Sequence, residues 1–167
     1  MCRLIACGAG VLLVLSVAVA SASAIDRPQT FSILEIDESD ASVDLGFDFQ
    51  RLPRPGDQFA FKSGLYQWAG TKRGVRVGRD EGHCIFVRVA GDAQHLSLDA
   101  HCAASFFLPA GSVVAEAFLS LPEGALNADI PVVGGTGAYA NARGFVHIRD
   151  LGTGDTGHTS LTFHLLP

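Results

Sequence analysis

Two acidic residues, Glu35 and Asp37, interrupt an apolar run and are the first candidates for chemistry. Side chains alternate between the two faces of a strand, so Phe31, Glu35 and Asp37 would share one face. A carboxyl group beside Phe31 would be desolvated, which raises its pKa and suits it to proton transfer near neutral pH. The alternative is that Leu34 and Ile36 face the core, which would leave Glu35 in solvent.

The chain has two tyrosines, Tyr66 and Tyr139. A phenol at the mouth of a pocket can donate a hydrogen bond to a substrate oxygen. Both are therefore candidate catalytic residues, and packing in a core or a turn is the alternative for each.

Other catalytic and metal-binding patterns are weak. None of the six histidines forms a His-x-His or His-x3-His pair, and no tight carboxylate cluster joins them. Ser112 and Ser120 lie in no nucleophile elbow. A glycine-rich stretch at 134–137 lacks the Gly-Lys-Ser/Thr of a phosphate-binding loop. We therefore expect neither a metal nor a cofactor.

Residues 1–24 have the features of a cleavable signal peptide. Arg3 supplies a positive charge, residues 4–19 are almost wholly apolar, and Ala22-Ser23-Ala24 has the small-x-small form of a cleavage site. A membrane anchor is the alternative, but small and polar residues dilute the end of the apolar run. We predict a secreted protein that begins near Ile25 and has no membrane attachment after cleavage.

Cleavage would remove Cys2 and Cys7 and leave Cys84 and Cys102. An even pair of cysteines in an oxidising compartment predicts an intramolecular disulfide. Two free buried thiols, or one thiol that serves a pocket, are the alternatives.

Charge argues against nucleic acid or an anionic membrane as a partner. The full chain carries a net charge of −5, and losing Arg3 makes the mature chain more acidic. The 143 residues of 25–167 match the length of one domain.

The periodicity after residue 30 is that of strands. Short runs rich in β-branched and aromatic residues alternate in two-residue steps, and turn signals separate them. No amphipathic helix of useful length fits between the glycines. The pattern predicts an all-β domain, and a closed antiparallel barrel hides its edges more completely than a sandwich.

The stretch Ile130–Gly144 is the most specific motif in the chain. Its glycines would supply positive φ or close backbone approach at a tight turn, and the stretch resembles the signature of the allene oxide cyclase and dirigent superfamily. Weaker matches follow the family order at residues 55–66, 74–84, 102–111 and 159–165. The resemblance implies an eight-stranded barrel.

The resemblance also implies a site and a class of function. Glu35 falls at the glutamate position of the cyclase branch, and Asp37 falls where the family has asparagine, so orientation of a water by an amide is in doubt. Cys84 falls at a pocket cysteine, and both tyrosines lie in family motifs.

A hydrophobic, oxygen-containing small molecule is the implied ligand, and cyclisation or isomerisation without a cofactor is the implied reaction. A dirigent-like module that sets the stereochemistry of coupling and a plain extracellular binding barrel are the alternatives. The superfamily includes dimers and trimers, so association into a homo-oligomer stays open.

Overall fold

The computed structural model describes residues 25–38, 43–44, 51–70, 72–92, 95–121, 126–152 and 158–167. The predicted signal peptide, residues 1–24, lies outside the described residues. No helix in the described part of the chain is long and apolar enough to cross a membrane.

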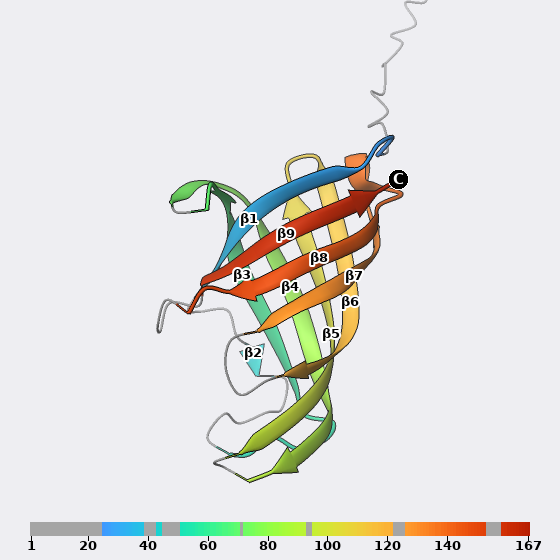
Figure 1. Ribbon diagram of the computed structural model, residues 1–167. Helices are drawn as coiled ribbons and strands as arrows, with labels where there is room; N and C mark the ends of the chain where they lie inside the picture. The colour runs from blue at the N-terminus through green and yellow to red at the C-terminus, as the bar shows by residue number, and fades with distance from the viewer. Residues whose placement is uncertain are drawn as a thin grey trace, which may run out of the picture.

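The described residues form β-strands and a single short helix (Figure 1). In chain order the elements are β1 (Gln29–Asp37), β2 (Val43–Asp44), β3 (Gln58–Trp68), β4 (Arg73–Gly91), β5 (Leu96–Leu108), β6 (Gly111–Leu121), β7 (Asn127–Gly135), the 3₁₀ helix η1 (Gly137–Tyr139), β8 (Arg143–Asp150) and β9 (His158–Leu166).

All the strand pairs are antiparallel, and the sheet closes on itself. From β3 to β9 each strand pairs with the next, β9 pairs with β1, and β1 pairs with β3. The result is the predicted eight-stranded barrel, with the two-residue β2 added to β3 beyond the reach of β1. Closure leaves every long strand with a partner on both sides, which removes the exposed edges of an open sheet.

The alternation of side chains explains why these sequences form a barrel. On β6, Val113 and Ala115 are buried, whereas Glu116 and Phe118 are exposed. Inward residues from all eight long strands fill the interior. The largest fully buried side chains include Phe163, Leu65, Leu161 and Val113.

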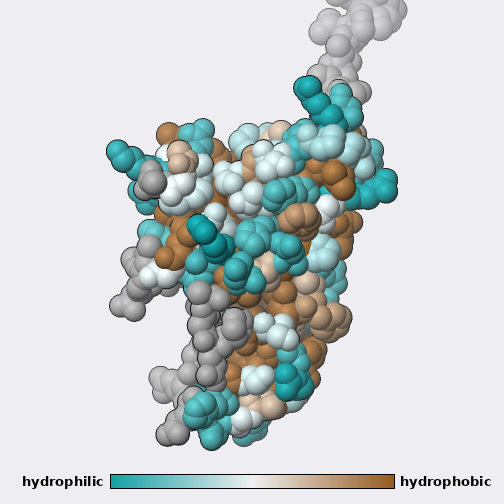
Figure 2. All heavy atoms as spheres, in the orientation of Figure 1, coloured by the Kyte–Doolittle hydropathy of each residue, from teal (hydrophilic) through white to brown (hydrophobic). Residues whose placement is uncertain are grey.

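The two ends of the barrel differ. The chain terminus at Pro167 and the β3–β4, β5–β6 and β7–β8 connections lie at one end, which we call the upper end (Figure 1). The long β4–β5 hairpin projects beyond the other, lower end. Apolar side chains gather on the lower part of the molecule (Figure 2), where Cys84, Phe86 and Ala100 form a second, smaller core.

The glycine-rich stretch forms the connection from β7 to β8, as expected, although Gly134 and Gly135 still belong to β7. Gly137 and Gly144 have positive φ. Gly135 does not, but a Cβ there would lie 2.5 Å from the carbonyl oxygens of both Ser112 and Tyr139. Close backbone approach is therefore the reason for glycine at position 135.

Candidate active site

Three strands bring acidic residues together in the lower half of the barrel. Ser63 of β3 is the register partner of Asp37 on β1 and of Asp80 on β4, so these residues form one row across the sheet. Glu35 lies two residues before Asp37 and, because of the two-residue alternation, on the same face of β1; Glu35 lines the interior cavity, whereas Asp37 at the end of the strand is exposed. The register therefore places three carboxyl groups around one hydroxyl.

The hydroxyl of Ser63 serves two of these groups. Its Oγ lies 3.2 Å from Oε1 of Glu35 and 3.1 Å from Oδ1 of Asp37, and it donates to both acceptors. Ser63 is 1% exposed. Since one hydroxyl carries one proton, it satisfies these acceptors incompletely.

Asp80 is 0% exposed, and neither of its carboxylate oxygens has a hydrogen-bond donor in good geometry among the described residues. The backbone N–H groups of Asp80 and Ser63 lie close enough to favour its ionised form only in part. No cation pairs with Asp80, Glu35 or Asp37 in the described part of the chain. An unpaired buried carboxylate is costly, so a proton is expected to be held here.

The pKa values of the pair reflect this environment. Burial raises the pKa of Asp80 to about 6. Burial, followed by the nearby charges of Asp80 and Asp37, raises the pKa of Glu35 well above its ordinary value, against a smaller lowering by the Ser63 hydrogen bond. The Glu35 and Asp80 carboxyl groups lie close enough to share a proton, which raises the pKa of Glu35 and lowers that of Asp80. This sharing favours the proton on Glu35 and the charge on Asp80.

A cavity of about 220 Å³ lies against this pair. Apart from Glu35, Asp80 and Thr159, its walls are side chains without a charge or a hydroxyl, and they come from β3 to β8 and from Leu126 just before β7. They include Phe59, Phe61, Phe106, Leu119, Ile130 and Ile148. Such walls exclude water and strengthen electrostatic interactions inside the cavity.

The disulfide predicted between Cys84 and Cys102 is present. The two residues are direct register partners on β4 and β5, and both line the cavity. The bridge thus forms part of the apolar wall as well as a covalent link between the strands.

The four predicted catalytic residues do not form one site. Glu35 and Asp37 come together through Ser63. Tyr66 points outward from β3: its ring lies over Gly64, and the Arg73 guanidinium stacks on it at 4.9 Å from the ring centroid. Tyr139 lies in a separate pocket at the upper end. Neither tyrosine lines the cavity, so we do not include them in the acid–base site.

Sequence reasoning missed Asp80 and Ser63. Asp80 lies in the charged run Arg79-Asp80-Glu81, which looks like solvent-exposed sequence. The available signal was that Asp80 shares a two-residue alternation with Cys84 and Phe86, both of which are buried.

No group of three or more His, Cys, Asp or Glu side chains in the described ranges is arranged to hold a metal ion. The acidic row instead places three carboxyl groups around the Ser63 hydroxyl, with Glu35 and Asp80 close together. What this arrangement provides chemically is a general acid beside a general base in an apolar cavity.

The sequence matches one protein-family model, and the fold matches several solved structures. The family model described as allene oxide cyclase barrel like domain matches residues 62–163. No curated protein matches the sequence.

Solved structures with the same barrel include three with different described roles. A pyocyanin demethylase is 24% identical, with a TM-score of 0.58 over 80% of this chain and 98% of that one. A nonspecific heme-binding cyclase of neoabyssomicin biosynthesis is 18% identical, with a TM-score of 0.62 over 85% and 69%. A pterocarpan synthase dirigent protein is 14% identical, with a TM-score of 0.58 over 84% and 94%. At these identities the likeness shows the fold.

Proposed function

This chain belongs to the family of allene oxide cyclase barrel-like domains, and from that membership and the interior site we propose that it isomerises or cyclises a small oxygen-containing hydrophobic molecule. The reaction uses proton transfer by Glu35 and Asp80 and needs no cofactor. The buried, unpaired Asp80 carboxyl group next to Glu35 in an apolar cavity is the observation that carries this proposal.

The pair supports acid–base chemistry because its two members have different roles at the same pH. The Asp80 carboxylate accepts a proton from a carbon next to a carbonyl, while protonated Glu35 donates a hydrogen bond to the carbonyl oxygen as charge develops there. The proton on Asp80 then returns to a different carbon of the same molecule. The substrate changes the position of a double bond or closes a ring, and both residues end as they began.

The structurally similar proteins support this class of reaction. The heme-binding cyclase catalyses a cycloaddition, and another barrel with a TM-score of 0.59 is described as an exo-specific intermolecular Diels–Alderase. In such reactions the protein contributes mainly by holding reacting atoms in a near-attack geometry. A rigid barrel with a dry interior suits that task.

The size of the cavity restricts the substrate. A volume of about 220 Å³ equals the space of about seven water molecules in the liquid and is below the usual range for drug-sized ligands. We expect a molecule with one ring, or a short chain that closes into one, and a single oxygen acceptor directed at Glu35.

A dirigent-like role is the second candidate, and the likeness to the pterocarpan synthase dirigent protein favours it. In that role another enzyme would generate the reactive species, and the barrel would only orient it. The carboxyl pair would then affect binding but not the rate of a proton transfer.

The test uses the isomerisation of 3-cyclohexen-1-one to its conjugated isomer, followed by ultraviolet absorbance. We expect catalysis by the mature protein and a loss of about 10²- to 10⁴-fold in kcat for Asp80→Asn and Glu35→Gln. Asp26→Asn is the matched control, because its side chain is 86% exposed.

Equal rates for the wild type, both cavity variants and buffer would contradict the proposal. In parallel, a coupling assay with a phenol and an added oxidase tests the dirigent-like role. Stereoselective coupling there, without isomerisation, would replace the first function by the second.

We also propose that the mature protein begins at Ile25 and is secreted. The Cys84–Cys102 disulfide supports an oxidising compartment. N-terminal sequencing of protein recovered from the medium of expressing cells checks the cleavage site. Retention of residues 1–24 on the exported chain would contradict it.

A further inference from the structure

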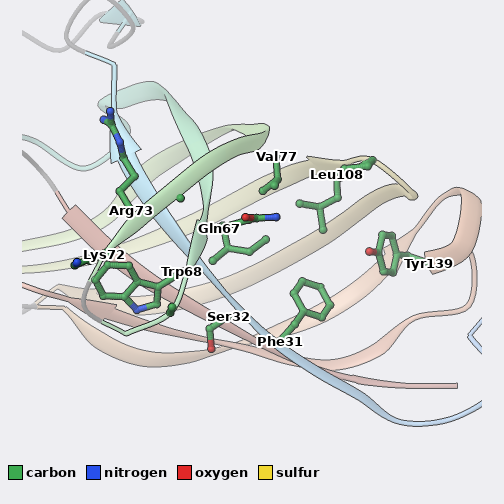
Figure 3. Close-up of a pocket in the computed structure, with 13 residues that line it drawn as sticks. Phe31, Ser32, Gln67, Trp68, Lys72, Arg73, Val77, Leu108 and Tyr139 are labelled. Atoms are coloured by element: carbon green, nitrogen blue, oxygen red, sulfur yellow. The ribbon is translucent and has the colours of Figure 1, made fainter.

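The barrel has a second chamber at its upper end, opposite the carboxyl pair. A pocket of about 650 Å³ opens between the start of β1, the β3–β4 hairpin and the end of β5 (Figure 3). This volume falls within the range of small-molecule sites. None of the acidic residues described above lines it.

Aromatic side chains separate the two chambers. Phe163 is 0% exposed; it stacks on Phe31 of the upper pocket at 4.9 Å and meets Phe106 of the lower cavity edge-to-face at 5.2 Å between ring centroids. Leu65 and Leu161, also 0% exposed, fill the same core. We call Phe163, Leu65 and Leu161 the partition. A ligand in the upper pocket does not reach the carboxyl pair, so the two chambers are independent sites.

The walls of the upper pocket provide aromatic surfaces. Phe31, Trp68 and Tyr139 line it from three different elements, and the rings of Phe31 and Tyr139 lie 6.4 Å apart between centroids. Val77 and Leu108 complete an apolar wall. Flat aromatic or conjugated molecules bind well to such surfaces, because ring stacking adds to the burial of apolar area.

Two polar side chains at the same pocket, Lys72 and Gln67, have no ion-pair or hydrogen-bond partner among the described residues. Lys72 lines the pocket and forms no ion pair with any described residue. The amide of Gln67 lies among the aromatic side chains (Figure 3) and hydrogen-bonds to no described residue. Gly74 makes room for it, since a Cβ at Gly74 would lie 2.7 Å from Cβ of Gln67.

The charges around the pocket also favour an acidic ligand. The Arg73 guanidinium stacks on Tyr66 outside the barrel, which leaves Lys72 as the ammonium group at the pocket. Burial raises the pKa of Tyr139, so its phenol keeps the proton that it can donate. The pocket therefore offers two cations, Lys72 and the Tyr66-stacked Arg73, together with the neutral hydrogen-bonding groups of Gln67 and Tyr139, on an otherwise acidic chain.

From this combination we propose that the upper pocket is a binding site for a planar aromatic acid. The ring lies between Phe31, Trp68 and Tyr139, and the carboxylate or another acidic group of similar size pairs with Lys72. This site does not depend on the catalytic role proposed for the lower cavity.

The test follows the indole N–H of Trp68 in ¹H–¹⁵N correlation spectra of the mature protein. Trp68 is the one tryptophan of the chain, so its indole gives a single signal, and the effect of Lys72→Gln distinguishes this pocket from the neighbouring one that Trp68 lines together with Arg149. The probes are 2-naphthoate and its neutral analogue 2-naphthalenemethanol. We expect saturable shifts with both and tighter binding of the acid.

Charge variants then locate the acid group. Lys72→Gln should weaken 2-naphthoate binding by about two- to fivefold, as expected for an exposed ion pair, and leave 2-naphthalenemethanol unchanged. Lys62→Gln is the matched control, because Lys62 pairs with Glu38 outside the pocket. Glu35→Gln should leave both affinities unchanged.

Three results would overturn the proposal. A Trp68 signal that does not move saturably excludes the pocket as a binding site. Equal binding of the two probes, or equal effects of Lys72→Gln and Lys62→Gln, excludes recognition of the acid. Loss of the Trp68 shift in Glu35→Gln would show that the two chambers are not independent.

Discussion

The pKa values of carboxyl groups inside the barrel and of those on its outer face are shifted in opposite directions. Asp99, on the outside of β5, accepts hydrogen bonds from Arg88 and Ser120, which lower its pKa. Arg51 does the same for Asp57. Inside, Asp80 and Glu35 have no arginine or lysine partner among the residues that the structure describes, and burial raises the pKa of each.

Packing alone would not favour the interior arrangement. Desolvation makes an unpaired buried carboxylate destabilising, and an apolar residue at position 80 would fit the surrounding phenylalanines and cysteines better. The outer pairs show that the chain has arginines available for acidic partners. Perturbed pKa values in a cavity are a feature of functional sites, and this contrast is the reason to assign function to the inside.

The largest expected effect on stability comes from removing the Cys84–Cys102 disulfide, which forms part of the cavity wall. Replacing Cys84 and Cys102 together with serine should lower the free energy of unfolding by roughly 3 kcal/mol in the chain-entropy model. The new hydroxyls at the cavity should also lower the pKa of Asp80 toward that of Asp99. Urea unfolding of this variant and of the wild type, each with and without reductant, measures the change. A variant as stable as the oxidised wild type would contradict the structural role of the bridge.

Removing the charge of Asp80 inside the barrel should instead raise the free energy of unfolding. The pKa of folded Asp80, about 6, exceeds its ordinary value of 3.8. The folded state therefore binds more protons than the unfolded state between these values, and the free energy of unfolding falls as pH rises through them. Asp80→Asn removes this loss, so it should stabilise the protein by about 2 to 3 kcal/mol at pH 8 and by little at pH 4.

Thermal melts at both pH values check this prediction, with the exposed Asp26→Asn as the control. Equal effects of Asp80→Asn at pH 4 and pH 8 would show that the Asp80 carboxyl group is not desolvated. Glu35→Gln should leave stability at pH 8 equal or higher for the same reason.

Titration of the carboxyl carbons by NMR compares the two regions directly. We expect Asp80 to titrate near pH 6, Glu35 above its ordinary value, and Asp99 below its ordinary value. Coupling between Glu35 and Asp80 should make both curves biphasic. In Asp80→Asn, the Glu35 curve should become a single step. An ordinary midpoint for Glu35 would remove it from the site.

The smallest effect on stability is expected for a carboxylate on the outer face of the barrel. Asp99→Asn should destabilise the protein slightly at pH 7, and added salt should reduce the difference, because the Arg88–Asp99 pair is exposed to solvent and screened. Unfolding at low and high ionic strength measures this. A destabilisation that is independent of salt concentration would mean that solvent does not screen the Arg88–Asp99 pair. The electrostatic environments of the inner and outer carboxylates would then differ less than their burial suggests.

Local sequence was sufficient for the fold class. Two-residue alternation predicted the strands but left open whether Glu35 or Leu34 faces the interior; in the structure Glu35 lines the cavity and Leu34 is buried as well. The disulfide followed from counting cysteines. These inferences need only neighbours along one strand.

The composition of the acidic site and the position of Tyr66 depended on contacts between strands. Ser63 joins Asp37 to Asp80 through the registers of β1, β3 and β4, and no local pattern states which residues of three strands will meet. Tyr66 was a candidate for a pocket mouth, with packing in a core or a turn as the alternative; in the structure the absence of a side chain at Gly64 lets the Tyr66 ring lie on the outer face. Such placements are decided by long-range pairing.

The pairing of β1 with β9 joins the first long strand of the barrel to the last. Gln29 meets Leu165, so the two strands that close the barrel are far apart in the sequence. Contacts of this kind require closure of a very long loop before they become favourable, which slows folding. A ribosome-bound chain that lacks residues 158–167 can form the successive hairpins from β3 to β8 but not the closed cylinder. Final closure is therefore expected only after residues 158–167 have left the ribosome, and on a timescale of milliseconds to seconds.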